Sequence, residues 1–518
     1  MRGISSAEHN PFLALARKET TEKSGQVYGF SLVYSGSFLG QVEVCTHDTT
    51  RVLMGIHPDT FEWPLKAGES FQTPELVMVY SEQGLSFMSQ IFHRLYRTRL
   101  ARGYWRDRER PVLLNNWEAT YMDFNEEKIL AIAKKAKETG VELFVLDDGW
   151  FGERSDDYRG LGDWQVNLNK LPEGISGLSE KVEALGLKFG LWIEPEMVNK
   201  DSRFYEAHPD WILSAPGRYE TPSRNQHVLD FSRKEIVDAV YGMLKDIIGN
   251  ARISYIKWDM NRYLTECYSR GTSPDGQGMV MHKFILGVYD LYTRLTRDFP
   301  EILFESCASG GARFDPGMLY FAPQAWCSDN TDAMDRLKIQ YGTTMVYPIS
   351  SIGAHVSAVP NHQVHRITPL DSRGNAAIFG AFGYELDLNH LSPEEIETVK
   401  QQIACYKKYR KLLHQGTFYR LKSPFEGNDT AWMAVSEDLE QAITAYYQVL
   451  NPANAGWLRL KLQGLCEDML YKVSLPGETG EYYGSELMYA GIPIDRNRIF
   501  RESGDFASFL IFINKKPE

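Results

Sequence analysis

The chain contains 518 residues, more than one compact domain usually holds, so two or three domains are expected. Hydrophobic residues make up 43% of the chain and charged residues 24%, which excludes a disordered tail and indicates a folded soluble protein. The formal net charge of −12, from 56 basic and 68 acidic residues, argues against nucleic acid or an anionic membrane as a partner. A neutral or cationic ligand suits this charge better.

The six cysteines lie far apart and form no C-x-x-C pair, so the sequence predicts neither a disulfide framework nor a zinc site. Free thiols of this kind are typical of a reducing compartment. The first residues, MRGISSAEHNPFLALAR, contain no apolar segment of signal-peptide length, and no apolar run reaches the eighteen residues of a membrane span. We therefore expect a cytoplasmic protein without a membrane partner.

Both ends of the chain have the pattern of antiparallel strands. Short alternating runs such as QVYGFSLVYSG and LGQVEV fill residues 26–100, and we expect residues 1–105 to form a partial N-terminal β-sandwich. Its opening, GISSAEHNPF, resembles the interior of a loop, so an N-terminal portion is expected to be missing. The runs TAWMAVS, QAITAYYQVL, GWLRLKL and ASFLIFIN predict a C-terminal antiparallel β-sandwich over 417–518.

Residues 106–416 alternate apolar runs with helical segments, which is typical of repeated βα units. Eight strands are predicted, at 112–118, 143–150, 188–195, 255–261, 302–311, 324–330, 346–353 and 382–388. No phosphate-binding G-x-G-x-x-G or Walker motif follows any of them, and G-x-S-x-G is absent. The first six strands end in polar or aromatic residues, so a (β/α)8 barrel, with its active site at the strand ends, fits better than a doubly wound sheet.

Three helices of this region have clear end signals. Ser232 with Glu235 predicts a capping box for a helix that stops at Gly249, and Ser392 with Glu395 predicts another for a helix that closes at Gly416. A third helix is expected over 126–139, with acidic residues in its first turn and lysines in its later turns, as the helix dipole favours.

Lys257 and Asp259, in YIKWDMN, are two residues apart on a strand and therefore share a face. An adjacent ammonium group favours the ionised form of Asp259, the form that a nucleophile needs. A buried structural ion pair explains the same spacing equally well.

Asp329 ends the sixth strand, two strands round the barrel from Asp259. Carboxylates at such strand ends can reach the roughly 5–5.5 Å separation of a retaining glycosidase or the wider gap of an inverting one, and the sequence does not choose between them. The alternative is that Asp329 or Asp332 caps the helix that follows. Glu194, Glu196 and Glu305 are rival catalytic carboxylates.

Asp147 and Asp148 are consecutive at the end of a strand, where the backbone can turn both side chains toward a ligand. Two carboxylates suit the hydroxyl groups of a sugar. Metal binding is the weaker alternative, because no histidine or further acid accompanies them at ligand spacing. His362 and His365 resemble half a metal site, but a solvated loop pair explains them better, and we expect neither a metal nor a cofactor.

Trp117, Trp150 and Trp192 follow three successive strands. Each alone would be interpreted as a core residue. Together at one barrel mouth they offer apolar faces on which sugar rings pack, and they favour a carbohydrate site.

Six motifs occur in a fixed order, namely LLNNWEATYMDF, VLDDGWFG, GLWIEPEMV, YIKWDMNR, ESCASGGARFD and WCSDNTDA. In this combination the chain resembles the α-galactosidases of glycoside hydrolase family 36. The resemblance implies a retaining (β/α)8 barrel between an N-terminal β-supersandwich and a C-terminal β-domain, usually in a tetramer. It also assigns the nucleophile to Asp259 and the general acid/base to Asp329.

The same resemblance implies a set of galactose contacts. Asp147 and Asp148 would hold the 4- and 6-hydroxyls, and Trp117 with Trp192 would shape the pocket. Further contacts are implied for Arg224 and Lys257 at ring hydroxyls, and for Cys307 with Gly310 on the side of the 2-hydroxyl.

The expected function is that of a retaining exo-α-galactosidase acting on melibiose-type or raffinose-type α-1,6-galactosides. One alternative is a galactosyltransferase of the raffinose or stachyose synthase type, and another is a non-catalytic galactoside-binding fragment. A homo-oligomer is expected, although the family's missing N-terminal part normally supplies a loop to a neighbouring active site and much of the tetramer contact.

Overall fold

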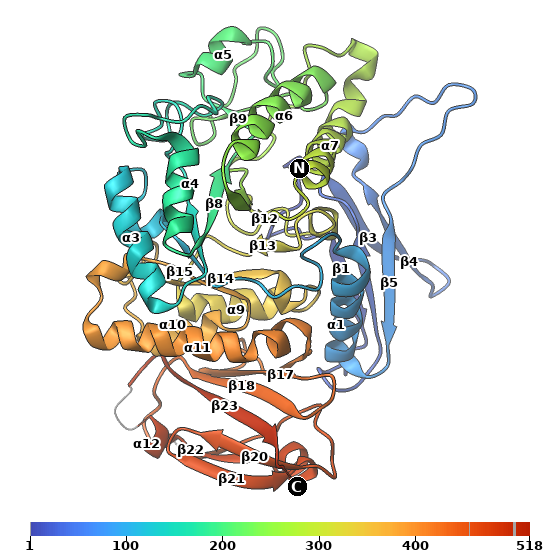
Figure 1. Ribbon diagram of the computed structural model, residues 1–518. Coiled ribbons are helices and arrows are strands. Elements are labelled where there is room, and N and C mark those ends of the chain that lie inside the picture. Colours follow the sequence, from blue (N-terminus) through green and yellow to red (C-terminus); the bar gives the residue numbers. More distant parts are fainter. Residues whose placement is uncertain (1, 455, 501–503, 518) are drawn as a thin grey trace.

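A closed parallel β-barrel forms the centre of the molecule, with antiparallel sheets on two sides of it (Figure 1). The computed structural model describes residues 2–454, 456–500 and 504–517. The N-terminal sheets, in blue, lie along one flank of the barrel, and the C-terminal sheets, in orange and red, lie below it. The predicted fold class, a (β/α)8 barrel with a C-terminal antiparallel domain, is confirmed.

Eight parallel strands close the barrel in the order β11-β12-β13-β14-β15-β6-β7-β8. In chain order they are β6 (Leu113–Asn115), β7 (Leu143–Leu146), β8 (Lys188–Ile193), β11 (Ile253–Trp258), β12 (Leu303–Ser306), β13 (Gln324–Trp326), β14 (Ile352–Ser357) and β15 (Ala381–Glu385). Nearly every residue of these strands is buried, because helices cover the outside and side chains fill the inside.

The register brings the residues of neighbouring strands level with one another. Lys257 of β11 is paired with Trp192 of β8 on one side and with Glu305 of β12 on the other. Side chains that leave the ends of these strands therefore meet at one mouth of the barrel.

Helices surround the barrel, and their bounds follow the expected end signals in two of three cases. The main ones are α3 (Glu126–Thr139), α4 (Gly174–Ala184), α6 (Lys234–Gly249), α7 (Val280–Asp298), α9 (Ala333–Thr343), α10 (Leu370–Ala377) and α11 (Pro393–Gln415), with the short α2 (Trp117–Thr120), α5 (Arg203–Ala207) and α8 (Pro316–Leu319) in the loops. The capping box of Ser392 and Glu395 is present, and α3 has the predicted bounds. The predicted box at Ser232 is wrong, because its hydroxyl donates to Asp230 and α6 begins without a side-chain cap.

Two other expectations need correction. The seventh strand is Ile352–Ser357 rather than 346–353, because the chain after Pro348 forms a short 3-10 turn before it enters the barrel. The segment 26–100 is not all strand, since Gly84–Leu95 forms helix α1 with an apolar face on the N-terminal sheet. Within the described residues, no helix is long and apolar enough to cross a membrane.

The N-terminal region contains a three-stranded sheet, β1-β2-β5, and a separate hairpin, β3-β4. Their bounds are β1 (Phe12–Ala16), β2 (Val27–Leu32), β3 (Phe38–Val44), β4 (Thr50–Ile56) and β5 (Leu76–Ser81). The C-terminal region contains a six-stranded sheet, β16-β17-β18-β23-β20-β21, and the pair β19-β22. Its strands are β16 (Thr417–Lys422), β17 (Asp429–Val435), β18 (Gln441–Gln448), β19 (Trp457–Leu460), β20 (Leu470–Leu475), β21 (Glu478–Tyr483), β22 (Ile492–Asp495) and β23 (Ala507–Lys515), with the short α12 (Arg496–Ile499) after β22.

One arginine joins all three regions. Arg420 of β16 is buried, and its guanidinium donates to both carboxylate oxygens of Glu22, at 3.0 and 2.9 Å, in the loop between β1 and β2. The same group donates to the carbonyl of Thr344, just after α9, at 2.8 Å, and to the hydroxyl of Ser89 in α1 at 2.9 Å. The guanidinium thus makes four hydrogen bonds to three residues in a buried junction, and its removal would leave the Glu22 carboxylate without its ion-pair partner.

We predict that Arg420→Ala lowers the free energy of unfolding by about 3 kcal/mol, because it leaves the partly buried carboxylate of Glu22 without its ion-pair partner. Urea unfolding followed by tryptophan fluorescence measures this. The control is Lys516→Ala, which breaks the exposed pair with Glu481 and is expected to change stability by less than about 1 kcal/mol. Equal stability of the two variants would contradict the role given to Arg420.

Candidate active site

A cavity of about 330 Å³ opens at the carboxyl ends of the barrel strands. The residues that line it come from the ends of seven of the eight strands and from the segments after them, and are Trp117, Glu118, Tyr121, Asp147, Asp148, Trp192, Arg224, Lys257, Asp259, Asn261, Trp326, Asp329, Thr331, His362, Gln363 and Glu385. Eight of the ten residues predicted from the sequence are in this set. The structure thus brings most of the predicted site together in one place.

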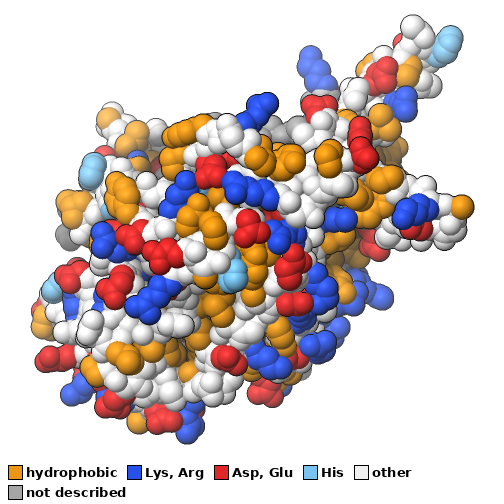
Figure 2. Space-filling view, turned by 90° about the horizontal axis from the view of Figure 1, so that it is seen from above, with side chains coloured by type: hydrophobic (Ala, Val, Ile, Leu, Met, Phe, Trp, Pro, Cys, Tyr) orange, Lys and Arg blue, Asp and Glu red, His pale blue; other side chains and the backbone are white. Residues whose placement is uncertain are grey.

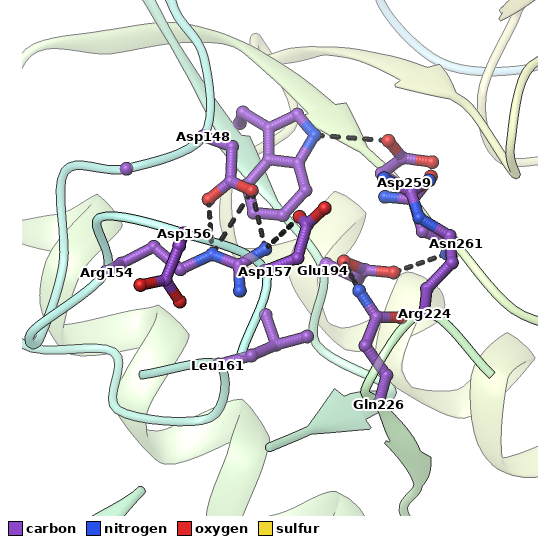
Figure 3. A network of polar contacts seen from close by, with 12 residues as sticks. Asp148, Arg154, Asp156, Asp157, Leu161, Glu194, Arg224, Gln226, Asp259 and Asn261 are labelled. Atoms are coloured by element: carbon purple, nitrogen blue, oxygen red, sulfur yellow. Dashed lines mark hydrogen bonds and ion pairs between the residues drawn. The ribbon is translucent and has the colours of Figure 1, made fainter. Parts of the chain in front are cut away.

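Asp259 follows the last residue of β11 and is buried at the floor of this cavity. Its carboxylate accepts a hydrogen bond from the indole Nε1 of Trp192, at 3.2 Å (Figure 3). It also accepts one from the backbone N–H of Met260, at 2.8 Å. These donors fix the orientation of the carboxylate.

Lys257 pairs with Asp147 rather than with Asp259. Its Nζ lies 2.9 Å from Oδ2 of Asp147, which also accepts a hydrogen bond of 2.6 Å from Asn115. Burial lowers the pKa of Lys257, but the carboxylates of Asp147 and Glu385 outweigh it and hold the pKa well above its ordinary value. The expected ion pair is therefore present with a different partner, and it is also part of the cavity wall.

Asp148 is bound by Arg154, an arginine that no motif or spacing had indicated. Arg154 is almost completely buried and donates three hydrogen bonds of 2.8–3.2 Å to the carboxylate of Asp148 (Figure 3). The sequence suggested two carboxylates without partners, but the structure pairs both Asp147 and Asp148. Each is neutralised by one cation, and each still faces the cavity.

Asp329 and Asp332, which the sequence could not tell apart as helix caps, have different positions. Asp332 caps α9, since its side chain accepts from the N–H groups of Met334 and Asp335. Asp329 has no such contact and lines the cavity. The helix-cap alternative is therefore correct for Asp332 and wrong for Asp329.

The surroundings of Asp329 make it a good acid. Burial raises its pKa, the negative charge of Asp259 raises it further, and Lys257 opposes both, so that the pKa is about 6 instead of the usual value near 4. A carboxyl group with this pKa keeps a proton at mildly acidic pH and gives it up readily.

The three rival carboxylates are engaged elsewhere. Glu196 is completely buried in an ion pair with Arg313, with both oxygens 2.9 Å from its Nη1. Glu305 accepts a 2.6 Å hydrogen bond from Gln324 inside the barrel. Glu194 lies behind Asp259, accepts from Gln226 and the N–H of Asn261, and has its pKa raised to about 8 by burial and by the charge of Asp259. None of the three is among the cavity-lining residues of the described chain.

Only two of the three tryptophans lie at the cavity. Trp117 and Trp192 line it, whereas Trp150 is fully buried, donates to the carbonyl of Trp192 and packs on Phe151 and Trp164. The expectation that Trp150 faces a sugar is wrong, because the chain turns after Asp148 and directs this ring into the core.

Cys307 and Gly310 lie behind the wall rather than in its lining. Cys307 is 1% exposed. Gly310 has a φ of +82°, and a Cβ at this position would lie 2.5 Å from the backbone nitrogen of Asp329. Glycine is needed here because the loop after β12 packs directly on the backbone that carries Asp329.

Several cavity residues were not predicted. Asn261 accepts a 2.9 Å hydrogen bond from Arg224, and Trp326 precedes Asp329 by three residues. Glu118 and Glu385 also line the cavity, and Glu385 accepts from the buried His355 at 3.0 Å. Asn261 and Trp326 lie within the recognised motifs, so the motifs could have indicated them. Glu385 ends the eighth strand, where the strand-end rule could have found it.

His362 and His365 do not form half a metal site. His362 lines the cavity and His365 does not. In the part of the chain that the structure describes, no group of three or more histidine, cysteine, aspartate or glutamate side chains is arranged to hold a metal ion.

The chemistry available to this cavity is that of glycoside cleavage. Breaking a glycosidic bond with two carboxyl groups requires one that donates a proton and another that faces the anomeric carbon. Asp329, whose pKa is raised, and Asp259 place two carboxyl groups in one cavity, at the mouth of a barrel lined with aromatic rings and paired carboxylates. The fold and the cavity therefore define a glycoside hydrolase.

Comparisons with known proteins identify the family. The Melibiase model matches residues 70–416, and the models of the N-terminal and C-terminal domains of glycosyl hydrolase family 36 match residues 1–66 and 429–513. Alpha-galactosidase AgaA of Geobacillus stearothermophilus is 56% identical over 509 residues, which are 98% of this chain and 69% of AgaA. Alpha-galactosidase 1 of Pediococcus pentosaceus is 47% identical, over 95% of this chain and 67% of that protein.

Solved structures agree with this assignment. The crystal structure of AgaA matches with a TM-score of 0.97 and covers 99% of this chain and 71% of its own. The alpha-galactosidase from Lactobacillus brevis is 50% identical, has a TM-score of 0.97 and covers 100% of this chain and 70% of its own. The chain belongs to glycosyl hydrolase family 36 and is an α-galactosidase of the retaining type.

We predict that Gly310→Ala lowers kcat by about a hundredfold, because the new methyl group displaces the backbone of Asp329, and a displacement of about 1 Å has such an effect on a catalytic group. Steady-state kinetics with p-nitrophenyl α-galactoside measure it. The control is Gly342→Ala in α9, where a Cβ meets no atom within 4 Å and kcat should be unchanged. A Gly310→Ala variant with normal kcat would show that this close packing does not position Asp329.

Proposed function

We propose that this chain removes terminal α-1,6-linked galactose from melibiose-type and raffinose-type oligosaccharides, with Asp259 as the nucleophile and Asp329 as the acid/base. The raised pKa of Asp329, in the same cavity as Asp259, carries the assignment. Variants of AgaA have been solved in complex with raffinose and with stachyose, which supports this class of substrate. The relatives named above are all hydrolases, so a transferase or a non-catalytic binding protein is not favoured.

In the first step the carboxylate of Asp259 attacks the anomeric carbon of the galactose. The bond from that carbon to the leaving oxygen breaks, and Asp329 gives its proton to the oxygen. The product of this step is a β-galactosyl ester on Asp259. The hydrogen bonds from Trp192 and Met260 support the role of Asp259, because they hold its carboxylate in one orientation.

In the second step a water molecule attacks the same carbon and displaces Asp259. Asp329, now ionised, takes the proton of that water. Two inversions leave galactose in the α configuration. The same pair of carboxyl groups thus performs both halves of the reaction.

Five further side chains are proposed to bind the galactose ring, and they are Asp147, Asp148, Trp192, Arg224 and Lys257, with Trp117 at the edge of the pocket. The pairing of Asp147 with Lys257 and of Asp148 with Arg154 supports this proposal. Each aspartate is neutralised, so a neutral sugar can bind without compensating a buried charge. Cys307 and Gly310 do not line the cavity, and they are proposed to support its wall on the side of the galactose 2-hydroxyl.

We also propose the domain boundaries 1–105, 106–416 and 417–518, supported by the end of α11 at Gln415 and the start of β16 at Thr417.

We further propose that the protein is a cytoplasmic homo-oligomer without a nucleic-acid partner. Acidic and basic side chains are interspersed on the face seen in Figure 2, which agrees with a protein that does not bind a polyanion.

The two catalytic roles can be separated by the products that azide forms. We predict that Asp259→Gly and Asp329→Gly each reduce hydrolysis of p-nitrophenyl α-galactoside, Asp259→Gly by about 10⁴-fold or more. In Asp259→Gly, azide replaces the nucleophile and gives β-galactosyl azide. In Asp329→Gly, azide attacks the ester on Asp259 and gives α-galactosyl azide. NMR of the products distinguishes them, and the same anomer from both variants would overturn the assignment.

We predict that kcat/KM for raffinose falls as the pH rises through about 6, because Asp329 must be protonated to assist the leaving oxygen and its pKa is raised to that value. Below this pH the acid form predominates and the first step is not limited by it. α-Galactosyl fluoride is the control substrate, since fluoride leaves without a proton and its profile should decline less on the alkaline side. If kcat/KM for the two substrates declined equally with rising pH, Asp329 would be excluded as the acid.

A further inference from the structure

A loop after β14, residues 358–366, carries two side chains of the cavity wall, His362 and Gln363. We call it the rim loop. Most of the other polar groups in the cavity are used by the proposed galactose site and the two catalytic carboxyl groups. His362 and Gln363 have no role in either, and they lie on a different part of the cavity wall.

Glu118, in the short helix α2 that follows β6, fixes the rim loop in place. Its side chain is only 2% exposed, and its Oε2 accepts from the N–H of Ala358 at 3.2 Å. Oε1 accepts from the hydroxyl of Thr331 at 2.7 Å and lies 3.4 Å from Nδ1 of His362. A single buried carboxylate thus joins the ends of β6, β13 and β14.

Thr331 and Asn361 complete this attachment. The side-chain amide of Asn361 donates to the hydroxyl of Thr331 at 3.0 Å, and its oxygen accepts from the N–H groups of Gln363 and Val364. Arg366 at the end of the loop pairs with Asp332, the cap of α9. The loop is therefore ordered on the same elements that carry Asp329.

The position of His362 and Gln363 relative to the reaction follows from the barrel order. The residues proposed for galactose come from β7, β8 and β11, whereas Asp329 follows β13 and the rim loop follows β14. The proton donor of a glycosidase lies on the side where the leaving sugar departs. The rim loop adjoins that donor and lies across the cavity from the galactose side.

We infer that His362 and Gln363 form a binding site for the sugar that leaves, next to Asp329. The inference rests on the proposed function and names the part of the substrate that these residues recognise. It makes Glu118 a positioning residue, because its carboxylate holds the rim loop and His362 in place.

The chemistry of the two side chains fits a sugar hydroxyl. Because Nδ1 of His362 faces Glu118, the opposite nitrogen, Nε2, is directed away from that carboxylate, and in the described residues it has no hydrogen-bond partner. The hydrogen bond to Glu118 raises the pKa of His362, so Nε2 carries a proton to donate over a wider pH range. The amide of Gln363 can both donate and accept.

An aromatic corner faces the same opening. Tyr121 is 45% exposed, and its ring contacts that of Trp117 edge to face, with the centroids 5.2 Å apart. Its backbone has a φ of +48° and a ψ of −136°, a conformation that costs free energy for a non-glycine residue. An exposed aromatic ring held in this way at the rim offers a face on which a second sugar ring can pack.

The test compares two substrates that share galactose and differ in what leaves. Raffinose has a disaccharide as its leaving group, whereas α-galactosyl fluoride loses a single atom and leaves this part of the cavity empty. We expect His362→Ala and Gln363→Ala each to lower the ratio of kcat/KM for raffinose to kcat/KM for the fluoride by roughly three- to tenfold, the effect of losing one hydrogen bond.

The matched control is His365→Asn, in the same loop but outside the cavity. Its φ of +57° is one that asparagine tolerates, and neither substrate should be affected. Glu118→Gln is the second variant, since it keeps the shape of the side chain and removes its charge, and it should lower the same ratio mainly through KM for raffinose. Circular dichroism establishes that all four variants are folded.

An unchanged ratio in both alanine variants would overturn the inference. So would an equal loss with both substrates, since it would place the effect at the galactose side or in folding. If the unaltered enzyme cleaves neither substrate, the proposed function itself is wrong, an outcome distinct from a failure of the rim-loop assignment alone.

Discussion

Like charges crowded around one buried cavity are the constraint on which the site depends. Asp147, Asp148, Asp259, Asp329 and Glu385 all line it, and isolated carboxylates in such a place would be prohibitively unfavourable. Lys257 and Arg154 neutralise two of them, and His355 donates to a third. Asp259 and Asp329 are the two that remain. Burial and the charge of Asp259 raise the pKa of Asp329, so the relief of buried charge favours a proton on the residue proposed as the acid.

This arrangement divides the wall into a rigid part and a reactive part. The ion pairs of Lys257 and Arg154 are built on the strand ends and on buried loops, so they hold the proposed galactose side in a fixed shape. Asp329 stands instead on a backbone supported from behind by Gly310. Glu118 holds the rim loop, which forms a third side of the cavity, through hydrogen bonds with Thr331 and Ala358. Contacts within the protein therefore hold three sides of the cavity, and a wall fixed in this way favours electrostatic catalysis.

The sequence predicted the barrel, the class of enzyme and eight of the residues that meet at the cavity, because strand ends and motifs are local features. It missed Arg154, which is six residues beyond Asp148 and returns to it only through a loop. It could not separate Asp329 from Asp332, since either spacing fits a helix cap and only the folded backbone decides. The sequence also placed Trp150 at the barrel mouth, because only the folded backbone shows where its ring points. One turn of the chain after Asp148 sends that ring inward. The roles of the site residues stay predictions until the variants are measured.

The contacts of Arg420 have a consequence for how the molecule opens. This one guanidinium holds the loop after β1, helix α1, the end of α9 and strand β16, so neither sheet region can detach from the barrel without breaking it. Local fluctuations that would expose the flanking sheets one at a time are suppressed. Slow amide hydrogen exchange is then expected to extend from the barrel into β16 and the adjoining N-terminal strands as one cooperative unit, instead of fading at the domain borders.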